Sequence, residues 1–157
     1  SCRIFGRWEE FCDLPIEQIK WGVDVNLMGT VYFCHEAMRQ MRKQKSGVII
    51  NFGSITGLEG DTCGLDYAIS KSAIMNGLNK SLAKEGARYG VRVNCVAPGP
   101  VLTRPGMANM KTALGRAADP QEIVDMVLYL ASERSSFVTG ATILMDGGRH
   151  LLMEDGV

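Results

Sequence analysis

The sequence predicts an α/β fold in which a parallel sheet is covered by helices on both faces. Segments with helical spacing of apolar residues alternate along the chain with short apolar, β-branched segments. Many of the 18 glycines come just after these short segments, where strands would end. The resulting order of helix, strand, helix, strand, helix, strand is typical of parallel sheets with helical crossovers.

The first predicted helix begins near Pro15, a residue favoured in the first helical turn. Its apolar positions recur at helical spacing, and a basic run closes the helix, as the helix dipole favours. The apolar positions are Ile19, Val23, Leu27, Val31 and Cys34, and the basic run is Arg39, Arg42, Lys43 and Lys45. The run "GVIINF", residues 47–52, follows and ends at Gly53, which predicts a buried strand.

Helical spacing returns between residues 65 and 89, and Gly90 is placed to stop this second helix. The run "VRVNCVA", residues 91–97, predicts a second strand, which Pro98 and Gly99 interrupt.

Residues 100–118 contain prolines and scattered methionines and are expected to be irregular. The third helix has a strong start signal, with Asp119 as cap, Pro120 at the first position and Glu122 three residues after the cap. The run "ATILMDGG", residues 141–148, predicts the third strand and its end.

Composition excludes several classes of protein. A chain of 157 residues with 17 basic and 17 acidic side chains fits one domain and offers no global charge for nucleic acid or an acidic membrane. It has no apolar run of membrane-spanning length. Its five cysteines are odd in number and contain no C-x-x-C pair, and the N-terminal stretch lacks the order of a signal peptide. These features predict a cytoplasmic protein with reduced thiols and no metal site.

Candidate chemistry gathers at the predicted strand ends. Ser54 follows the first strand, Pro98-Gly99-Pro100 the second and Asp146-Gly147-Gly148 the third. Ligands of open parallel sheets bind at this carboxyl edge.

Tyr67 and Lys71 stand four residues apart in the second helix, so both side chains project from one face. A nearby ammonium favours the phenolate and lowers a tyrosine pKa from its ordinary value of about 10. Such a tyrosine can exchange a proton with an alcohol or ketone oxygen that a serine hydroxyl holds in place. Taken singly, the same residues are also typical of an ordinary helix surface and a turn.

The order and spacing of these motifs together resemble the short-chain dehydrogenase/reductase family. The resemblance runs from about residue 5 to residue 149 through "NLMGT", "GVIINFGSITG", "LDYAISKSA", "VRVNCVAPGPVLT" and "VTGATILMDGG". Ser54 precedes Tyr67 by 13 residues and Tyr67 precedes Lys71 by four, as in that family's active site. Asn26, in "VNLMGT", matches the asparagine of the family's Asn-Ser-Tyr-Lys tetrad.

The resemblance implies a Rossmann-type, doubly wound fold and hydride transfer between a secondary alcohol or ketone and NAD or NADP. Tyr67 would be the general acid/base, Lys71 would tune it and hold the cofactor ribose, and Ser54 would bind the substrate oxygen. Asn26 would support a water linked to Lys71. The implied cofactor contacts are Tyr67, Lys71, Pro98, Gly99, Val101 and Thr103.

One large part of the family pattern is absent, because no G-x-G-x-x-G turn occurs in the sequence. The resemblance therefore implies that residues 1–157 are the C-terminal portion of a single domain, with the last three strands and without the N-terminal βαβ units. One edge of strand 47–52 would then be unpaired. The helices carrying Asn26 and Tyr67 would form a homodimer or homotetramer. The alternative to an enzyme is a truncated, inactive chain that acts as an oligomerising interaction subunit.

A hydrolase is disfavoured by two departures from the motifs that it would need. "HEAMR", from His35, has Arg39 where a zinc helix requires a second histidine, and Ser54 lacks the G-x-S-x-G surroundings of a nucleophile elbow. Substrate identity is left open, although the side chains of Met107, Met110 and Leu114 suggest an apolar wall for a modest carbonyl compound.

Overall fold

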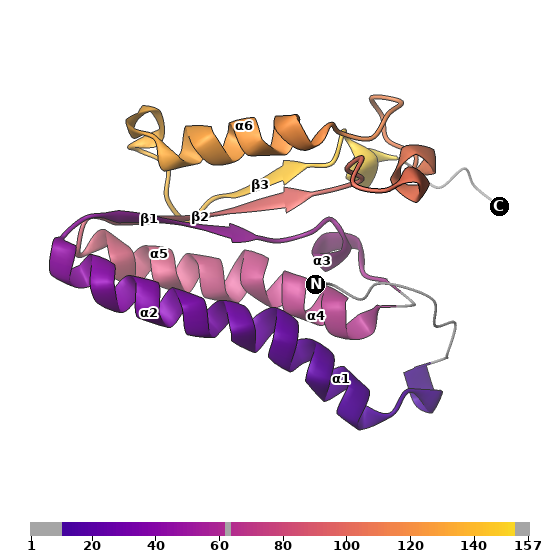
Figure 1. Cartoon of the computed structure of the whole chain (residues 1–157), viewed down its shortest axis with the longest axis horizontal. Helices are drawn as coiled ribbons and strands as arrows, with labels where there is room; N and C mark the ends of the chain where they lie inside the picture. Colours follow the sequence, from indigo (N-terminus) through magenta and orange to yellow (C-terminus); the bar gives the residue numbers. More distant parts are fainter. Residues whose placement is uncertain (1–10, 62–63, 153–157) are drawn as a thin grey trace.

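The computed structural model describes residues 11–61 and 64–152 and confirms the α/β fold with its parallel three-stranded sheet (Figure 1). The strands are β1 (Gly47–Phe52), β2 (Val91–Pro98) and β3 (Thr142–Met145). The helices are α1 (Ile16–Val23), α2 (Gly29–Gln44), α3 (Thr56–Glu59), α4 (Leu65–Ala73), α5 (Asn79–Ala87) and α6 (Pro120–Ala131). Short 3₁₀ turns cover Phe11–Asp13, Pro105–Asn109, Glu133–Ser135 and Arg149–Leu151.

The two long predicted helices are each continuous but contain a widened π-helical turn. Asp24–Met28 joins α1 to α2, and Ile74–Leu78 joins α4 to α5. Two ends differ slightly from prediction. Pro15 precedes the first helix instead of lying within it, and α5 ends at Ala87, two residues early. Gly90 then takes the left-handed conformation (φ +70°) expected of a helix stop.

β2 is the central strand and the most deeply buried part of the sheet. It pairs in parallel with β1 and β3, with Gly47 opposite Val91 and Cys95 opposite Thr142. The apolar side chains that it buries are Val91, Val93, Cys95, Val96 and Ala97. A strand covered on both faces requires such a run of small and β-branched apolar residues.

Side chains of β2 alternate between two separate apolar layers. Val91 and Val93 pack with α2 and α5, whereas Val96 packs with α6. Figure 1 shows these layers below and above the sheet. The chain crosses from β1 to β2 through α4 and α5, and from β2 to β3 through α6, and both crossovers move in the same direction across the sheet. Two crossovers of the same hand would therefore place these helices on the same face of the sheet. One of the two crossovers is therefore left-handed, against the usual preference.

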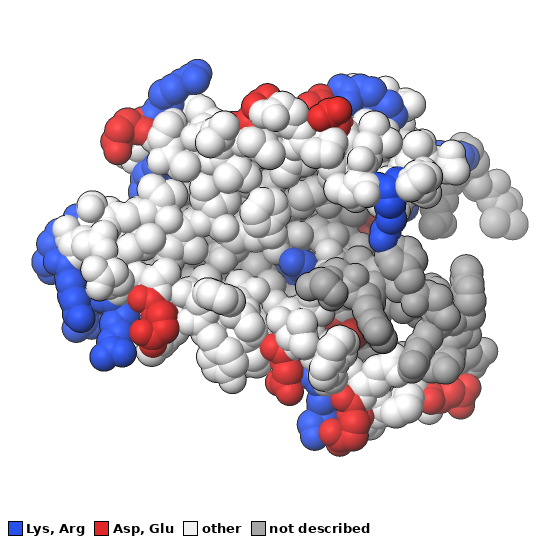
Figure 2. Space-filling view, viewed as in Figure 1, with Lys and Arg blue, Asp and Glu red and all other residues white. Residues whose placement is uncertain are grey.

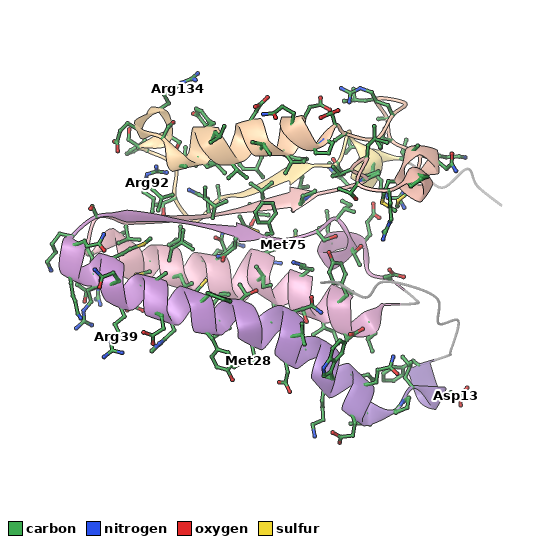
Figure 3. The ribbon with its side chains drawn as sticks, viewed as in Figure 1. Asp13, Met28, Arg39, Met75, Arg92 and Arg134 are labelled. Atoms are coloured by element: carbon green, nitrogen blue, oxygen red, sulfur yellow. The ribbon has the colours of Figure 1, made fainter. Side chains whose placement is uncertain are left out.

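Two polar side chains of β2 hold the connection between α6 and β3. Arg92, labelled in Figure 3, donates to the carbonyls of Ser132 (3.1 Å) and Val138 (3.3 Å). Asn94 is fully buried, donates to the Val138 carbonyl (2.9 Å) and accepts from the Ala141 N–H (3.1 Å). These bonds provide hydrogen-bond partners for backbone groups of this connection, and they fix the point at which the chain returns to the sheet.

The edge of β1 that faces away from β2 has no strand partner within residues 11–61 and 64–152. Phe52, at the end of this strand, is 45% exposed. The structure thus agrees with the expected free edge.

Charge is spread over the molecule without a single dominant field. Basic side chains gather at the left of Figure 2, where the basic run closes α2, and both signs are interspersed over the rest of this face. In the described ranges, no helix combines the length and apolarity needed to cross a bilayer, and no three potential metal ligands stand together.

The predicted start of α6 is confirmed as a capping box. The Asp119 side chain accepts from the Gln121 N–H (2.8 Å), and the Glu122 side chain accepts from the Asp119 N–H (2.8 Å). The Arg116 guanidinium also donates two hydrogen bonds, of 2.6 and 2.8 Å, to the Glu122 carboxylate. The hydrogen bonds from Arg116 and from the Asp119 backbone lower the pKa of Glu122 to about 2.

We expect the Glu122 carboxylate to make the stability of the protein depend on pH in the acidic range. A pKa lowered in the folded state contributes stability above the ordinary value of 4.5, and this contribution is lost as pH falls toward 2. The difference in free energy of unfolding between the wild type and Glu122→Gln should therefore be constant near neutral pH and shrink below about pH 4.5. Denaturant unfolding at several pH values measures it, and a pH-independent difference would contradict the assignment.

Candidate active site

The segments that follow the three strands are held side by side by backbone hydrogen bonds. The Ile55 N–H donates to the Pro98 carbonyl (2.9 Å), and the Gly99 N–H donates to the Met145 carbonyl (3.0 Å). Ser54, Pro98 and Gly99 therefore lie at the same carboxyl edge of the sheet, as predicted. Gly99 allows this close contact, because a Cβ there would lie 2.7 Å from the Cα of Asp146.

Ser54 is buried and lies two residues before the short helix α3. Its hydroxyl oxygen accepts a 3.2 Å bond from the Thr56 N–H, a turn that local sequence favours. The helix α3 then packs directly on α4, because Gly57 has no side chain. A Cβ at Gly57 would lie 2.7 Å from the Ser72 nitrogen and 2.8 Å from the Lys71 carbonyl carbon. The serine segment and the Lys71 turn are thus in direct contact.

Tyr67 and Lys71 form the pair that the four-residue spacing predicts. The Lys71 ammonium nitrogen lies 5.4 Å from the centre of the Tyr67 ring, and both side chains are half-buried. The same nitrogen donates a 2.8 Å bond to the carbonyl of Phe52, the last residue of β1. This bond, which sequence reasoning missed, aims the lysine at the strand end that precedes Ser54. Its acceptor is a backbone atom, so no residue type signals it.

Cys95, on β2, is fully buried. Burial raises the pKa of its thiol to about 11, although a hydrogen bond from the Gly53 backbone and the positive charge of Lys71 act in the opposite direction. A thiol with so high a pKa is a poor nucleophile.

Asn26 lies in the widened turn between α1 and α2. Its amide nitrogen donates to the Gly22 carbonyl (2.9 Å), and the Thr30 hydroxyl donates to the Asn26 carbonyl (2.8 Å). The first long helix crosses α4 closely at Gly22, where a Cβ would collide with the Asp66 carboxylate. Asn26 is therefore carried on a helix packed against the one that bears Tyr67 and Lys71. Widened turns of this kind are frequent at functional sites.

Val101 and Thr103, the other expected cofactor contacts, do not lie together at the strand ends. Val101 forms a bridge with Ala118, and its side chain packs into the apolar layer under α6. Thr103 is exposed, and its N–H and hydroxyl turn back to the Val101 carbonyl (2.6 and 3.4 Å). The Val101 side chain therefore faces the α6 core, and this residue has only its backbone to offer a ligand at the strand ends.

A cavity of about 530 Å³ lies on the α6 side of the sheet, between α6, β3 and residues 113–118. None of the candidate catalytic or cofactor residues lines it. Leu114, expected in an apolar wall near the substrate, is 71% exposed and lines this other cavity. Met107 and Met110 are half-buried in the segment between β2 and α6.

Asp146 is a buried acid at the end of β3 whose structural role the sequence did not reveal. Burial opposes its ionisation, but bonds from the His150 N–H (2.9 Å), the His150 ring (2.6 Å) and the Gly148 N–H (3.0 Å) outweigh this and lower its pKa. The carboxylate shapes the turn after β3.

Comparison with known protein families identifies this arrangement. Residues 5–150 match the family model described as enoyl-(acyl carrier protein) reductase. The chain is 40% identical over 144 residues to carbonyl reductase family member 4 of Xenopus tropicalis, covering 87% of this chain and 59% of that protein. It is also 40% identical over 136 residues to the 3-oxoacyl-[acyl-carrier-protein] reductase FabG of Chlamydia muridarum, covering 80% and 54%. It thus spans a little over half the length of these relatives.

Solved structures agree with the sequence matches. The acetoin dehydrogenase YohF of Salmonella typhimurium superposes with a TM-score of 0.85 at 32% identity, covering 96% of this chain and 64% of that one. A 3-oxoacyl-[acyl-carrier protein] reductase of Brucella melitensis with bound NAD gives 0.82 at 35% identity, covering 89% and 55%. The family model, the sequence relatives and the solved structures agree, and the chain belongs to the short-chain dehydrogenase/reductase family.

Proposed function

We propose that this chain carries the catalytic residues of an NAD(P)-dependent oxidoreductase acting on a secondary alcohol or ketone. The observation that carries the proposal is the Lys71 ammonium, 5.4 Å from the Tyr67 ring centre on a helix that contacts the Ser54 segment. A tyrosine beside a lysine, on a helix packed against the serine segment at the ligand-binding edge of a parallel sheet, supports a role in proton transfer to a substrate oxygen. The names of the relatives, reductases and dehydrogenases, support the same class of reaction.

In this proposal Tyr67 exchanges a proton with the substrate oxygen. The Lys71 charge stabilises the phenolate form, and the Ser54 hydroxyl donates a hydrogen bond to the oxygen as negative charge develops there. Asn26 supports a water that connects Lys71 with solvent. A bound nicotinamide would supply the hydride or accept it.

The residues present fit the nicotinamide and ribose end of such a cofactor. Lys71 and Tyr67 offer donors for a ribose, and the backbone of Pro98 and Gly99 forms a close-packed wall at the end of β2. Val101, through its backbone, and Thr103 complete the proposed contacts.

Because the sequence has no glycine-rich pyrophosphate turn, we propose that this chain is the C-terminal portion of the domain and that the free edge of β1 receives the rest of the sheet. The proposal covers NAD and NADP alike. It also includes a cytosolic location, with which the free thiols of Cys12, Cys34 and Cys95 agree.

The proton-transfer role predicts the behaviour of Tyr67→Phe. In a protein that includes the pyrophosphate-binding part of the domain, kcat should fall by about 10²- to 10⁴-fold, the range of general acid–base catalysis. Affinity for NADH and NADPH, measured by fluorescence titration, should fall by no more than about tenfold, because the variant loses one hydroxyl contact to the ribose while the contact from Lys71 is retained. Near-normal turnover in this variant would rule out the assigned role.

The apolar wall of the proposed substrate site is reduced to Met107 and Met110. Replacing both by serine should raise KM for apolar ketones about fivefold while kcat changes little, because the substitution removes apolar surface and no proton donor. Steady-state kinetics with a short and a longer aliphatic ketone measures this. Leu114→Ser, on the other cavity, is the matched control and should leave KM unchanged.

We also propose that the chain forms a homodimer or homotetramer through its long helices. Trp21, Val25, Tyr32 and Phe33 expose an apolar surface along α1 and α2, and the Phe33 side chain is 84% exposed. An apolar surface of this kind marks an interaction site. An inactive chain that acts as an oligomerising interaction subunit could use the same surface. Self-association therefore does not distinguish the enzyme from this alternative, whereas titration with NADH and NADPH does.

Phe33→Glu is expected to shift the protein to a smaller species, because burying a carboxylate in an apolar interface is costly. Sedimentation over a range of concentrations compares it with the wild type and with Leu114→Glu, an exposed apolar position outside these helices. If all three proteins sediment alike, the helices do not form the interface.

A further inference from the structure

Arg149 joins the segments that follow all three strands. Its Nε lies 3.3 Å from Oε2 of Glu59, the last residue of α3, which follows β1 and Ser54. Its Nη1 donates a 3.2 Å bond to the carbonyl of Lys111, in the segment between β2 and α6. Arg149 itself belongs to the turn after β3. One guanidinium thus connects three segments that are far apart in the sequence.

The turn that presents Arg149 is held in place by Asp146. The Arg149 N–H donates to the Asp146 carbonyl (3.1 Å), while the carboxylate accepts from the N–H groups of Gly148 and His150. Gly147 and Gly148 take left-handed conformations (φ +61° and +74°), which side chains disfavour. Because this backbone is already ordered, Arg149 gives up less conformational freedom when it forms its contacts.

The ion pair of Arg149 and Glu59 is better shielded than the surface pair of Lys20 and Glu17 on α1. The side chains of Arg149 and Glu59 are 29% and 32% exposed, whereas those of Lys20 and Glu17 are 61% and 81% exposed. Hydrogen bonds made by charged groups are stronger than neutral ones, and shielding from water preserves that strength. The guanidinium can therefore hold the Lys111 segment against α3.

We propose that Arg149 is a positioning residue that keeps the segment around Lys111 closed against α3 and so sets the opening to Ser54. Glu59 lies five residues after Ser54, and α3 packs through Gly57 on the turn of Lys71. A shift of either segment would therefore change the space between the proposed substrate wall and the serine hydroxyl. The role in substrate access rests on the proposed function, whereas the closure itself does not.

Trypsin offers a direct probe of the closure, because the bond that it cleaves after Lys111 contains the carbonyl that Arg149 holds. The purified chain is digested briefly, and mass spectrometry follows cleavage at Lys111–Thr112 and, as a reference at the other end of the sheet, at Lys45–Ser46. Arg149→Met should accelerate the first cleavage by about three- to tenfold and leave the second unchanged, because cleavage follows the population of the open form.

Further variants separate the two contacts. Glu59→Gln should accelerate cleavage at Lys111 less than Arg149→Met, because the bond to the Lys111 carbonyl is retained, and the double variant should be no faster than Arg149→Met alone. Arg149→Lys keeps the charge and should recover part of the protection. Arg134→Met, a remote arginine (Figure 3), should match the wild type. Unchanged cleavage in Arg149→Met, or equal acceleration at both bonds, would overturn the closure.

Steady-state kinetics tests the positioning role in a protein that includes the pyrophosphate-binding part of the domain. Glu59→Gln should raise KM for a ketone about threefold with kcat nearly unchanged, because the opening and not the proton donor is altered. A fall in kcat without a change in KM would contradict it. If the wild type shows no turnover at all, the proposed function fails, yet the protease measurement still decides whether Arg149 closes the segment.

Discussion

Burial of β2 between two strands and two helical layers is the constraint on which the rest of the structure depends. Its backbone is paired on both sides, and its apolar side chains are removed from water on both faces. Since a one-residue shift would turn Asn94 into the α5 layer and Val93 into the α6 layer, the register of the sheet is strongly specified. The three carboxyl strand ends are thereby aligned, and Ser54, Pro98 and Gly99 lie at that common edge.

Small residues convert this alignment into a site. Gly57 lets α3 rest on the Lys71 turn, Gly22 lets the first long helix cross α4, and Gly99 lets the chain after β2 pass close to Asp146. A side chain at Gly57 would push apart the elements that carry Ser54 and Lys71, and one at Gly22 would collide with the Asp66 carboxylate on the helix that carries Tyr67. The candidate site therefore depends on close packing, which glycines permit where these elements approach each other.

Much of this was predictable because it depends on local patterns. The three strands, the long helices and the capping box at Asp119 follow from apolar periodicity and from residues that satisfy a helix end on their own. The proximity of Tyr67 and Lys71 follows from helix geometry. The widened turns at Asp24–Met28 and Ile74–Leu78 did not follow, since they depend on how the two long helices pack together.

The sequence by itself determined the fold class, the strand ends and the pairing of Tyr67 with Lys71, because periods of two and 3.6 residues and a four-residue spacing are local properties. Only the tertiary structure decided the left-handed crossover, the direction of the Val101 side chain, the bond from Lys71 to the Phe52 carbonyl and the contacts of Arg149 with Glu59 and Lys111. These contacts join residues distant in the chain, and several involve backbone atoms that every residue type carries. Their partners are therefore set by three-dimensional packing and not by any pattern of neighbouring residues.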